Sequence, residues 1–281
     1  MSDFVRPNDL RVNVRLGRIL SDQEKYEEGL PYLKKSVEIS RESDPDNVGD
    51  LLSEVAYSYY KMNDFANAAA VFKERVELLP HETKAAGLRN VIACYQSLQE
   101  NDSVFKYTNE VLMIEPDDGE SLALIGGTWF NKAQEVNSSI SAAKKADDAE
   151  RVKTLEAERT RNYDSVVYFL DKAVKADTTD ASSYERLAIA YALQGVPAKA
   201  TFAWKKLTEL SPEVSQNWVN LGDNYISLKE FKNSILPYEK SVELDNTNGA
   251  VWRILVDLYQ TNGMPDKAKK ASARLDELSS K

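Results

Sequence analysis

The sequence contains very little of the chemistry that most enzymes and metal proteins require. Its 281 residues include one cysteine and one histidine. A single cysteine excludes an internal disulfide framework. One histidine and one cysteine argue against a zinc site and against a Cys–His or Ser–His nucleophile, and no carboxylate pair stands in a context that indicates a raised pKa. We therefore expect no enzyme activity, no metal site and no bound cofactor.

Long hydrophobic runs are absent as well. No segment approaches the roughly 18 consecutive apolar residues that a membrane-spanning helix needs, so we expect no membrane insertion. Residues 1–9 contain no apolar stretch, which predicts no signal peptide and favours the cytoplasm. A mature chain whose signal had been removed would look the same, and the periplasm is the alternative. The net charge of -9 argues against nucleic acid as a partner.

The two rare residues have ordinary interpretations. Cys94 lies within a helical pattern, where a small buried core residue is expected rather than a reactive thiol. His81 directly follows Pro80 between two helical patterns, where a solvated surface residue is expected rather than a catalytic base.

What the sequence does contain is a pattern that returns every 34 residues. Trp218, Leu221, Gly222 and Tyr225 stand at i, i+3, i+4 and i+7, which places them on one face of a helix. The aliphatic position is filled along the chain by Leu16, Val55, Val91, Ile125, Leu187, Leu221 and Leu255. The next position is mostly small, and the aromatic position reads Leu20, Tyr59, Tyr95, Trp129, Tyr191, Tyr225 and Tyr259. A fixed period of this length predicts stacked helical hairpins.

These positions, with Pro80, Pro116 and Pro212 where a second helix should end, resemble the tetratricopeptide repeat (TPR) family. The resemblance implies an all-α fold, a right-handed α-solenoid of about seven hairpins of helices A and B. We expect an N-terminal extension of residues 1–9 and a single solenoid domain of residues 10–281. Its repeats should lie near residues 10–43, 49–82, 85–118, 119–180, 181–214, 215–248 and 249–281.

The fourth repeat is longer than the others. Its start and the next are 62 residues apart where 34 are expected, and the surplus of 28 falls in about residues 131–161. This stretch has no proline or glycine and is rich in good helix formers. We expect both helices of the repeat to gain 14 residues each, forming a hairpin that projects about 21 Å. A flexible loop is the alternative.

In TPR proteins helix A lines a concave surface on which peptides or helices bind. The resemblance therefore implies a non-catalytic scaffold or adaptor that binds a protein or peptide partner in this groove. The candidate groove residues at the family's concave positions are Arg11, Arg15, Arg18, Tyr57, Tyr60, Lys61, Arg89, Asn90, Gln96, Glu185, Asn220, Asp223, Arg253, Asp257 and Gln260. The family's carboxylate clamp for chaperone tails requires Lys and Asn, then Lys and Arg, where this chain has Val14, Arg18, Ala86 and Asn90, so that activity is not expected.

Charge suggests what the groove receives. Arg11, Arg15 and Arg18 share one helix face in an otherwise acidic third of the chain, and like charges there repel unless an anion compensates. With Arg89, they are expected to receive an acidic peptide or a terminal carboxylate; in the alternative, Asp22 and nearby glutamates neutralise them. Asp223 and Asp257 occupy one position in adjacent repeats and are expected to form a ladder.

The C-terminal end offers a second functional reading. The last repeat has no polar capping helix after it, and Ala268, Ala271, Leu275 and Leu278 form an apolar stripe on its second helix. The alternative function is therefore a self-associating assembly or envelope-biogenesis factor that forms a homo-oligomer through this end.

Overall fold

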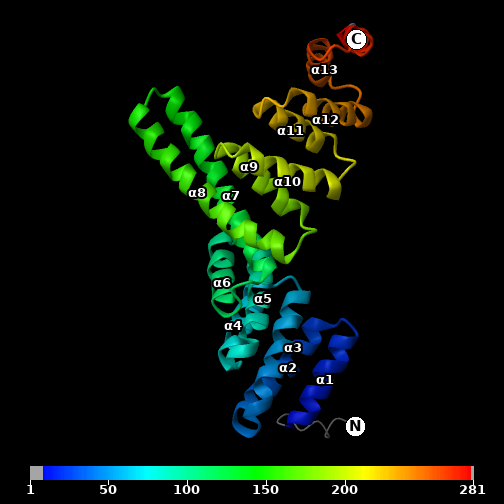
Figure 1. Cartoon of the computed structure of the whole chain (residues 1–281). Coiled ribbons are helices and arrows are strands. Elements are labelled where there is room, and N and C mark those ends of the chain that lie inside the picture. The colour runs from blue at the N-terminus through cyan, green and yellow to red at the C-terminus, as the bar shows by residue number, and fades with distance from the viewer. Residues whose placement is uncertain (1–8, 280–281) are drawn as a thin grey trace. The chain divides into compact units, whose positions relative to one another are not determined.

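The structure is a computed structural model that describes residues 9–279. Over these residues the chain forms fourteen α-helices that pack as consecutive antiparallel pairs (Figure 1). The helices are α1 (Leu10–Asp22), α2 (Tyr26–Ser43), α3 (Val48–Lys61), α4 (Phe65–Leu78), α5 (His81–Ser97), α6 (Asn101–Ile114), α7 (Gly119–Lys145), α8 (Ala149–Ala176), α9 (Ala181–Leu193), α10 (Pro197–Leu210), α11 (Ser215–Ser227), α12 (Phe231–Leu244), α13 (Gly249–Thr261) and α14 (Pro265–Ser279), with a short 3-10 helix η1 (Pro45–Asn47) before α3. The expected all-α fold of consecutive hairpins is confirmed.

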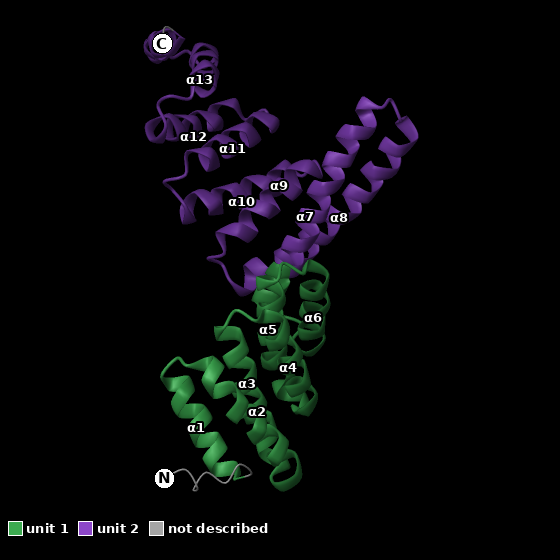
Figure 2. Cartoon of the chain, turned by 180° about the vertical axis from the view of Figure 1, so that it is seen from behind, with its two compact units in different colours: residues 1–124 green, residues 125–281 purple. Residues whose placement is uncertain are grey.

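The chain divides into two compact units, residues 1–124 and residues 125–281 (Figure 2). Unit 1 contains the first three helix pairs, and unit 2 contains most of α7 and all helices from α8 to α14. The expected N-terminal extension lies outside the described residues except for Asp9, whose side chain accepts a hydrogen bond from the Val12 amide and caps α1. That residues 10–281 act as a single domain stays a prediction.

One type of turn closes every described helix pair. Three residues separate the two helices, and the middle residue has a positive φ. These middle residues are Glu24, Asn63, Gln99, Asp147, Gly195, Lys229 and Gly263. The next amide then donates back to a carbonyl five residues earlier, as from Val196 N to Tyr191 O at 2.9 Å, which is the Schellman arrangement that ends a helix. Glycine adopts this conformation without the Cβ clash that other residues meet.

The fourth helix pair has the same turn, but both of its helices, the arms of this hairpin, are longer. α7 has 27 residues and α8 has 28, against 13 and 14 in α9 and α10, so each arm gains 14 residues. Side chains hold the arms together beyond the stack: Asn137 donates to the Tyr163 hydroxyl at 3.1 Å, and Lys144 pairs with Glu156 at 3.4 Å. A small separate core contains Val136, Ile140, Ala143 and Leu155. The predicted long helices are confirmed, and the flexible-loop alternative is wrong.

Because this outer core is separate from the others, the projecting arms should be dispensable for folding. Deleting residues 138–161 and joining Asn137 to Asn162 by a short turn should leave the remaining helices folded, since each repeat packs on its neighbours alone. We expect the melting temperature, followed by circular dichroism, to stay within roughly 5 °C of the original. An unfolded product would mean that the arms contribute to the packing of the whole of unit 2.

A second recurring contact joins several of the hairpins to the preceding one. The tyrosine at the aromatic position of helix A reaches a polar residue on the preceding helix B: Tyr191 donates to Asp171 at 2.6 Å, and Tyr259 donates to Glu239 at 2.8 Å. In unit 1 the polar residue is a lysine, and Lys73 donates to the Tyr95 hydroxyl at 3.1 Å. The aromatic ring thus fills the core while its hydroxyl finds a partner at the surface.

Cys94 on α5 is fully buried, as the sequence predicted, and burial raises the pKa of its thiol to about 11. Only the thiolate attacks disulfide reagents, so the folded protein should react negligibly with Ellman's reagent at pH 8. In concentrated guanidinium the same thiol should react fully within minutes. Fast, complete labelling of the folded protein would instead show that α5 opens readily.

Candidate functional site

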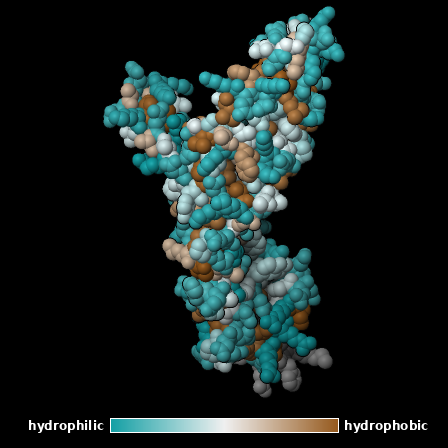
Figure 3. Space-filling view, viewed as in Figure 1, coloured by the Kyte–Doolittle hydropathy of each residue, from teal (hydrophilic) through white to brown (hydrophobic). Residues whose placement is uncertain are grey.

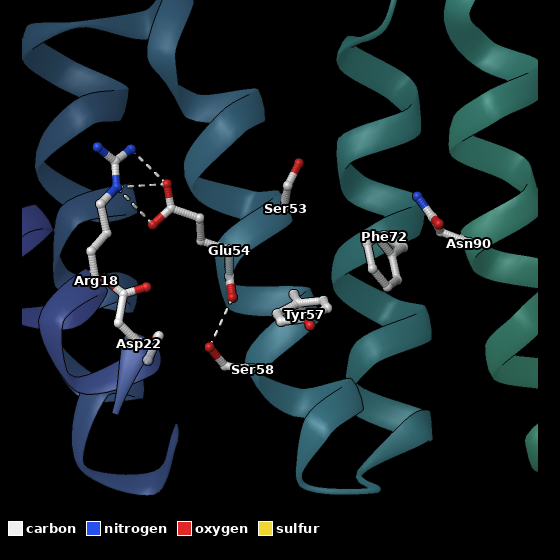
Figure 4. Close-up of a pocket in the computed structure, with 9 residues that line it drawn as sticks. Arg18, Asp22, Ser53, Glu54, Tyr57, Ser58, Phe72 and Asn90 are labelled. Carbon is white, nitrogen blue, oxygen red and sulfur yellow. Dashed lines mark hydrogen bonds and ion pairs between the residues drawn. The ribbon is translucent and has the colours of Figure 1, made fainter. Parts of the chain in front are cut away.

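A cavity of about 490 Å³ opens on the helix A side of unit 1 (Figure 4). Helices α1, α3, α4 and α5 contribute its walls. The lining residues are Arg18, Ser21, Asp22, Ser53, Glu54, Tyr57, Ser58, Phe72 and Asn90. The volume lies in the range of sites that hold small molecules or single side chains of a partner.

An ion pair forms one wall of this cavity. Arg18 donates from Nε to both Glu54 oxygens, at 2.9 and 3.1 Å, and from Nη2 to Oε1 at 2.6 Å. These hydrogen bonds raise the pKa of Arg18, because Glu54 stabilises the charged guanidinium. The Nη1 group of Arg18 donates no hydrogen bond to any residue in the range 9–279. Glu54, rather than Asp22, is therefore the residue that pairs with Arg18, and the two N–H donors of Nη1 have no partner among the described residues.

The opposite wall is aromatic. The Tyr57 side chain lies between the Arg18–Glu54 pair and Phe72 in the view of Figure 4. Tyr57 is 50% exposed, whereas Phe72 is 8% exposed and belongs to the core. Lys61 lies over the Tyr57 ring, 5.1 Å from its centroid. The buried Ser21 hydroxyl also lines the cavity and has no hydrogen-bond partner among the described residues. An occupant would therefore meet the exposed aromatic ring of Tyr57.

The basic face of α1 extends away from this cavity. Arg11, Arg15, Arg18 and Asp22 follow one another at helical spacing on one side of α1, and the last two line the cavity. Arg11 and Arg15 are exposed and form no ion pair within the part of the chain that the structure describes. Two exposed arginines without an ion pair among the described residues thus continue the face of α1 that begins at the cavity with Arg18.

Most of the other candidates in unit 1 are not among the residues that line the cavity. Arg89 pairs with Glu115 and with Asp118, the latter at 2.8 Å, and Asp118 also accepts from the Ser121 amide at the start of α7. Burial raises the pKa of Asp118, but hydrogen bonds from Ser121 and Arg89 outweigh it and hold that pKa below its usual value. Tyr60 packs edge-on against Phe65. Asn90 lines the cavity, whereas Lys61 and Gln96 are exposed elsewhere on α3 and α5.

The candidates in unit 2 have separate surroundings. Asp223 accepts a hydrogen bond from Tyr238 of its own repeat, and Asn220 accepts one from Gln216 at 2.9 Å. Asp257 lines a different cavity of about 310 Å³ with Ile226, Phe231, Ile254, Leu258 and Thr261. Glu185, Arg253 and Gln260 are exposed. The expected ladder of Asp223 and Asp257 therefore stays a prediction. In the structure, Asp223 accepts its hydrogen bond from Tyr238.

The apolar stripe of the last helix is largely covered by its own repeat. Ala268 and Ala271 are buried, and Leu275 lies next to Gly249 at the start of α13. Leu275 and Leu278 are half-buried. The stripe thus packs mainly as the seam between α13 and α14.

Several residues of the cavity escape the sequence pattern. Glu54 and Ser53 lie on a helix A but outside the candidate positions, and Phe72 lies on a helix B, where the pattern predicts only core packing. Within residues 9–279 no group of three or more His, Cys, Asp or Glu side chains is arranged to hold a metal ion. None of the described helices combines the length and apolarity that crossing a membrane requires.

Comparison with known proteins agrees with this architecture. Family profiles described as tetratricopeptide repeat match residues 9–80 and residues 215–248. Together with the seven in-phase helical hairpins, these matches identify the chain as a tetratricopeptide repeat protein. No curated protein sequence matches the chain significantly.

Solved structures of distant relatives share the fold. The C-terminal part of a TPR repeat-containing protein from Cytophaga hutchinsonii is 16% identical, covers 96% of this chain and 95% of its own, and has a TM-score of 0.55. A tetratricopeptide repeat protein from Parabacteroides merdae is 14% identical, with 96% of both chains covered and a TM-score of 0.51. YrrB, described as a TPR protein with an unusual peptide-binding site, is 13% identical over 76% of this chain and 95% of its own, with a TM-score of 0.51.

Proposed function

We propose that this protein is a non-catalytic scaffold that binds an extended, acidic segment of a partner protein on the helix A side of unit 1. TPR proteins as a class typically mediate protein–protein interactions, and the similar structure YrrB is described as having a peptide-binding site. The observation that carries the proposal is the cavity beside Arg18, with Arg11 and Arg15 along the same helix face and without an ion pair to any of residues 9–279.

The two parts of the surface would recognise different parts of the segment. An apolar side chain entering the cavity would bury itself against Tyr57 and Phe72, which is worth about 1.5–3 kcal/mol for a leucine or phenylalanine. Carboxylates on neighbouring residues, or a chain terminus, would receive charge-assisted hydrogen bonds from Arg15 and Arg11. Arg18 joins the two parts, because it lies both in the cavity wall and on the basic face, and its Nη1 group has no partner among residues 9–279.

Charge reversal tests this assignment. A 12-residue peptide is first selected on the intact protein from a random library with free C-termini, and its affinity is measured by fluorescence anisotropy. Arg15→Glu is expected to abolish its binding, since attraction becomes repulsion on the basic face of α1, while helicity by circular dichroism stays unchanged.

The matched control is Arg151→Glu in α8, an equally exposed arginine on the projecting hairpin. This variant should bind the selected peptide as the unmodified protein does. Unchanged affinity of Arg15→Glu, or selected peptides without acidic residues, would remove the proposal.

A further inference from the structure

A row of exposed apolar side chains crosses the solvent side of three successive B helices in unit 2. Tyr168 on α8, Phe202 on α10 and Leu236 on α12 are spaced by 34 residues and are 58%, 60% and 60% exposed. We call these three residues the outer row. Their helices follow one another along unit 2 (Figure 1). The outer row therefore occupies one and the same position of the repeat, three times in succession.

The fold does not require apolar residues at this position. The equivalent residues of the B helices in unit 1 are Pro31, Ala70 and Lys106, and all three are exposed. The last helix, α14, has Lys270 there. In the view of Figure 3 the surface is mainly hydrophilic, with hydrophobic residues in separate patches. Single exposed apolar residues need no explanation, but three in register on adjacent elements are typical of a contact surface.

A second row, of lysines, runs beside the first. Lys172, Lys206 and Lys240 each follow an outer-row residue by four positions, which is one helical turn or about 6 Å along the helix. Lys172 donates to the Tyr168 hydroxyl at 3.2 Å and lies over its ring. We call these residues the lysine row. Two parallel rows, one apolar and one basic, thus extend across three helices.

The lysines are available to a new anion. Lys206 and Lys240 each form an ion pair at 2.6 Å with a glutamate three residues later, Glu209 and Glu243. Both glutamates are 62% exposed, and exposed pairs of this type contribute little to stability because water screens them. A carboxylate from a partner could therefore replace either glutamate at little cost.

A cavity adjoins the middle residue of the outer row. Phe202 borders a cavity of about 370 Å³ formed by residues of α8, α9 and α10, whose apolar lining includes Val174, Ala198 and Ala203. A side chain of the occupant could enter beside the Phe202 ring and anchor the contact, as buried apolar anchors do in helix-in-groove interfaces.

We propose that the outer row and the lysine row form a docking surface for an amphipathic α-helix of a partner protein, whose apolar stripe has aspartate and glutamate along one flank. In such a helix the stripe and the flank run parallel to its axis, which matches the two parallel rows. This surface lies on unit 2 and uses none of the residues assigned to the cavity of unit 1, so the two proposals stand or fall separately.

A peptide selection on the intact protein, followed by depletion on a variant that lacks the outer row, tests this docking surface. The probe is a displayed library of 18-residue helical peptides with a fixed leucine stripe and randomised flanking positions. It is selected on the intact protein and depleted on the variant Tyr168→Ser/Phe202→Ser/Leu236→Ser. We expect the retained helices to be enriched in Asp and Glu on one flank, and to bind Lys172→Gln/Lys206→Gln/Lys240→Gln at least tenfold more weakly.

The matched control is Leu78→Ser/Met113→Ser/Leu193→Ser, which removes three comparably exposed apolar residues that lie elsewhere. Retained helices should bind this control as tightly as the unmodified protein. The proposal is overturned if no helix distinguishes the outer-row variant, or if the retained flanks are basic or neutral. It is also overturned if the outer-row variant differs only in losing binding to phosphatidylserine vesicles or in having a lower solution mass, because a lipid surface or a second copy would then be the occupant.

Discussion

Gly126→Val is expected to lower the free energy of unfolding by about 3 kcal/mol, the largest loss that we predict for a single substitution. Gly126 is the small residue of helix A in the fourth repeat, where α7 crosses α8. A Cβ added there would lie 2.5 Å from Cγ of Leu170 and closer still to its Cδ2. Leu170 is fully buried, so relieving the clash requires its side chain to leave its packed position or the two helices to separate.

Gly49→Val is the matched control for this substitution. Gly49 lies in the first turn of α3, and a Cβ there would meet nothing within 4 Å. Helix propensity alone favours valine over glycine by a few tenths of a kcal/mol, so this variant should be nearly neutral. Urea unfolding followed by circular dichroism measures both. Equal losses at the two positions would contradict the view that close helix contact requires the small residue.

Above pH 10 the protein is expected to unfold cooperatively, because several buried tyrosines must ionise. Tyr191, Tyr238 and Tyr259 each donate to a carboxylate, and burial first, then that carboxylate, raises the pKa of each hydroxyl far above 10. A group whose pKa is raised in the folded state stabilises that state fully below its unfolded pKa, which is about 10 for tyrosine. This contribution is lost as the pH rises from 10 through the folded-state values.

Tyrosinate absorbance at 295 nm and helicity, followed together, test this expectation. The absorbance should rise in two stages, first for exposed tyrosines and then in one step that coincides with the loss of helicity. The variant Tyr191→Phe/Tyr238→Phe/Tyr259→Phe should be less stable at pH 7 by about 1 kcal/mol per lost hydrogen bond, yet lose less stability between pH 10 and pH 12. Complete ionisation by about pH 10.5 with full helicity would show that these hydroxyls are not held as described.

The helices could be predicted from the sequence because the same pattern of aliphatic, small and aromatic residues recurs in each repeat. A single match at Trp218, Leu221 and Tyr225 would be ambiguous, but its recurrence set the phase of each hairpin. The same phase located the surplus in the fourth repeat and its equal division between α7 and α8. The conformation of the turns was less predictable. Glu24 and Lys229 adopt a positive φ, which a sequence indicates only where glycine occupies the position. The Schellman hydrogen bonds impose that conformation whatever the side chain.

The candidate site was predicted in part. Arg18, Tyr57 and Asn90 do meet at one cavity, because Arg18 and Tyr57 hold the same position of successive A helices and Asn90 lies about one turn earlier on the same face of the next. The ion-pair partners of the arginines could not be assigned from the repeat positions. Arg18 pairs with Glu54 and Arg89 with Asp118, at separations of 36 and 29 residues, and no local spacing rule connects such residues. Which arginines stay unpaired depends on side-chain reach across neighbouring repeats, which the sequence alone does not give.

Hydrogen exchange of the intact protein with and without the acidic peptide selected on it tests the proposed function most directly. The account predicts slower exchange in the segments of α1 and α3 that carry Arg15, Arg18 and Tyr57, and no change in α11 to α14. Protection should disappear in Arg15→Glu and persist in Arg151→Glu. Protection confined to unit 2, or the same protection in both variants, would contradict the assignment of the binding site to the cavity of unit 1.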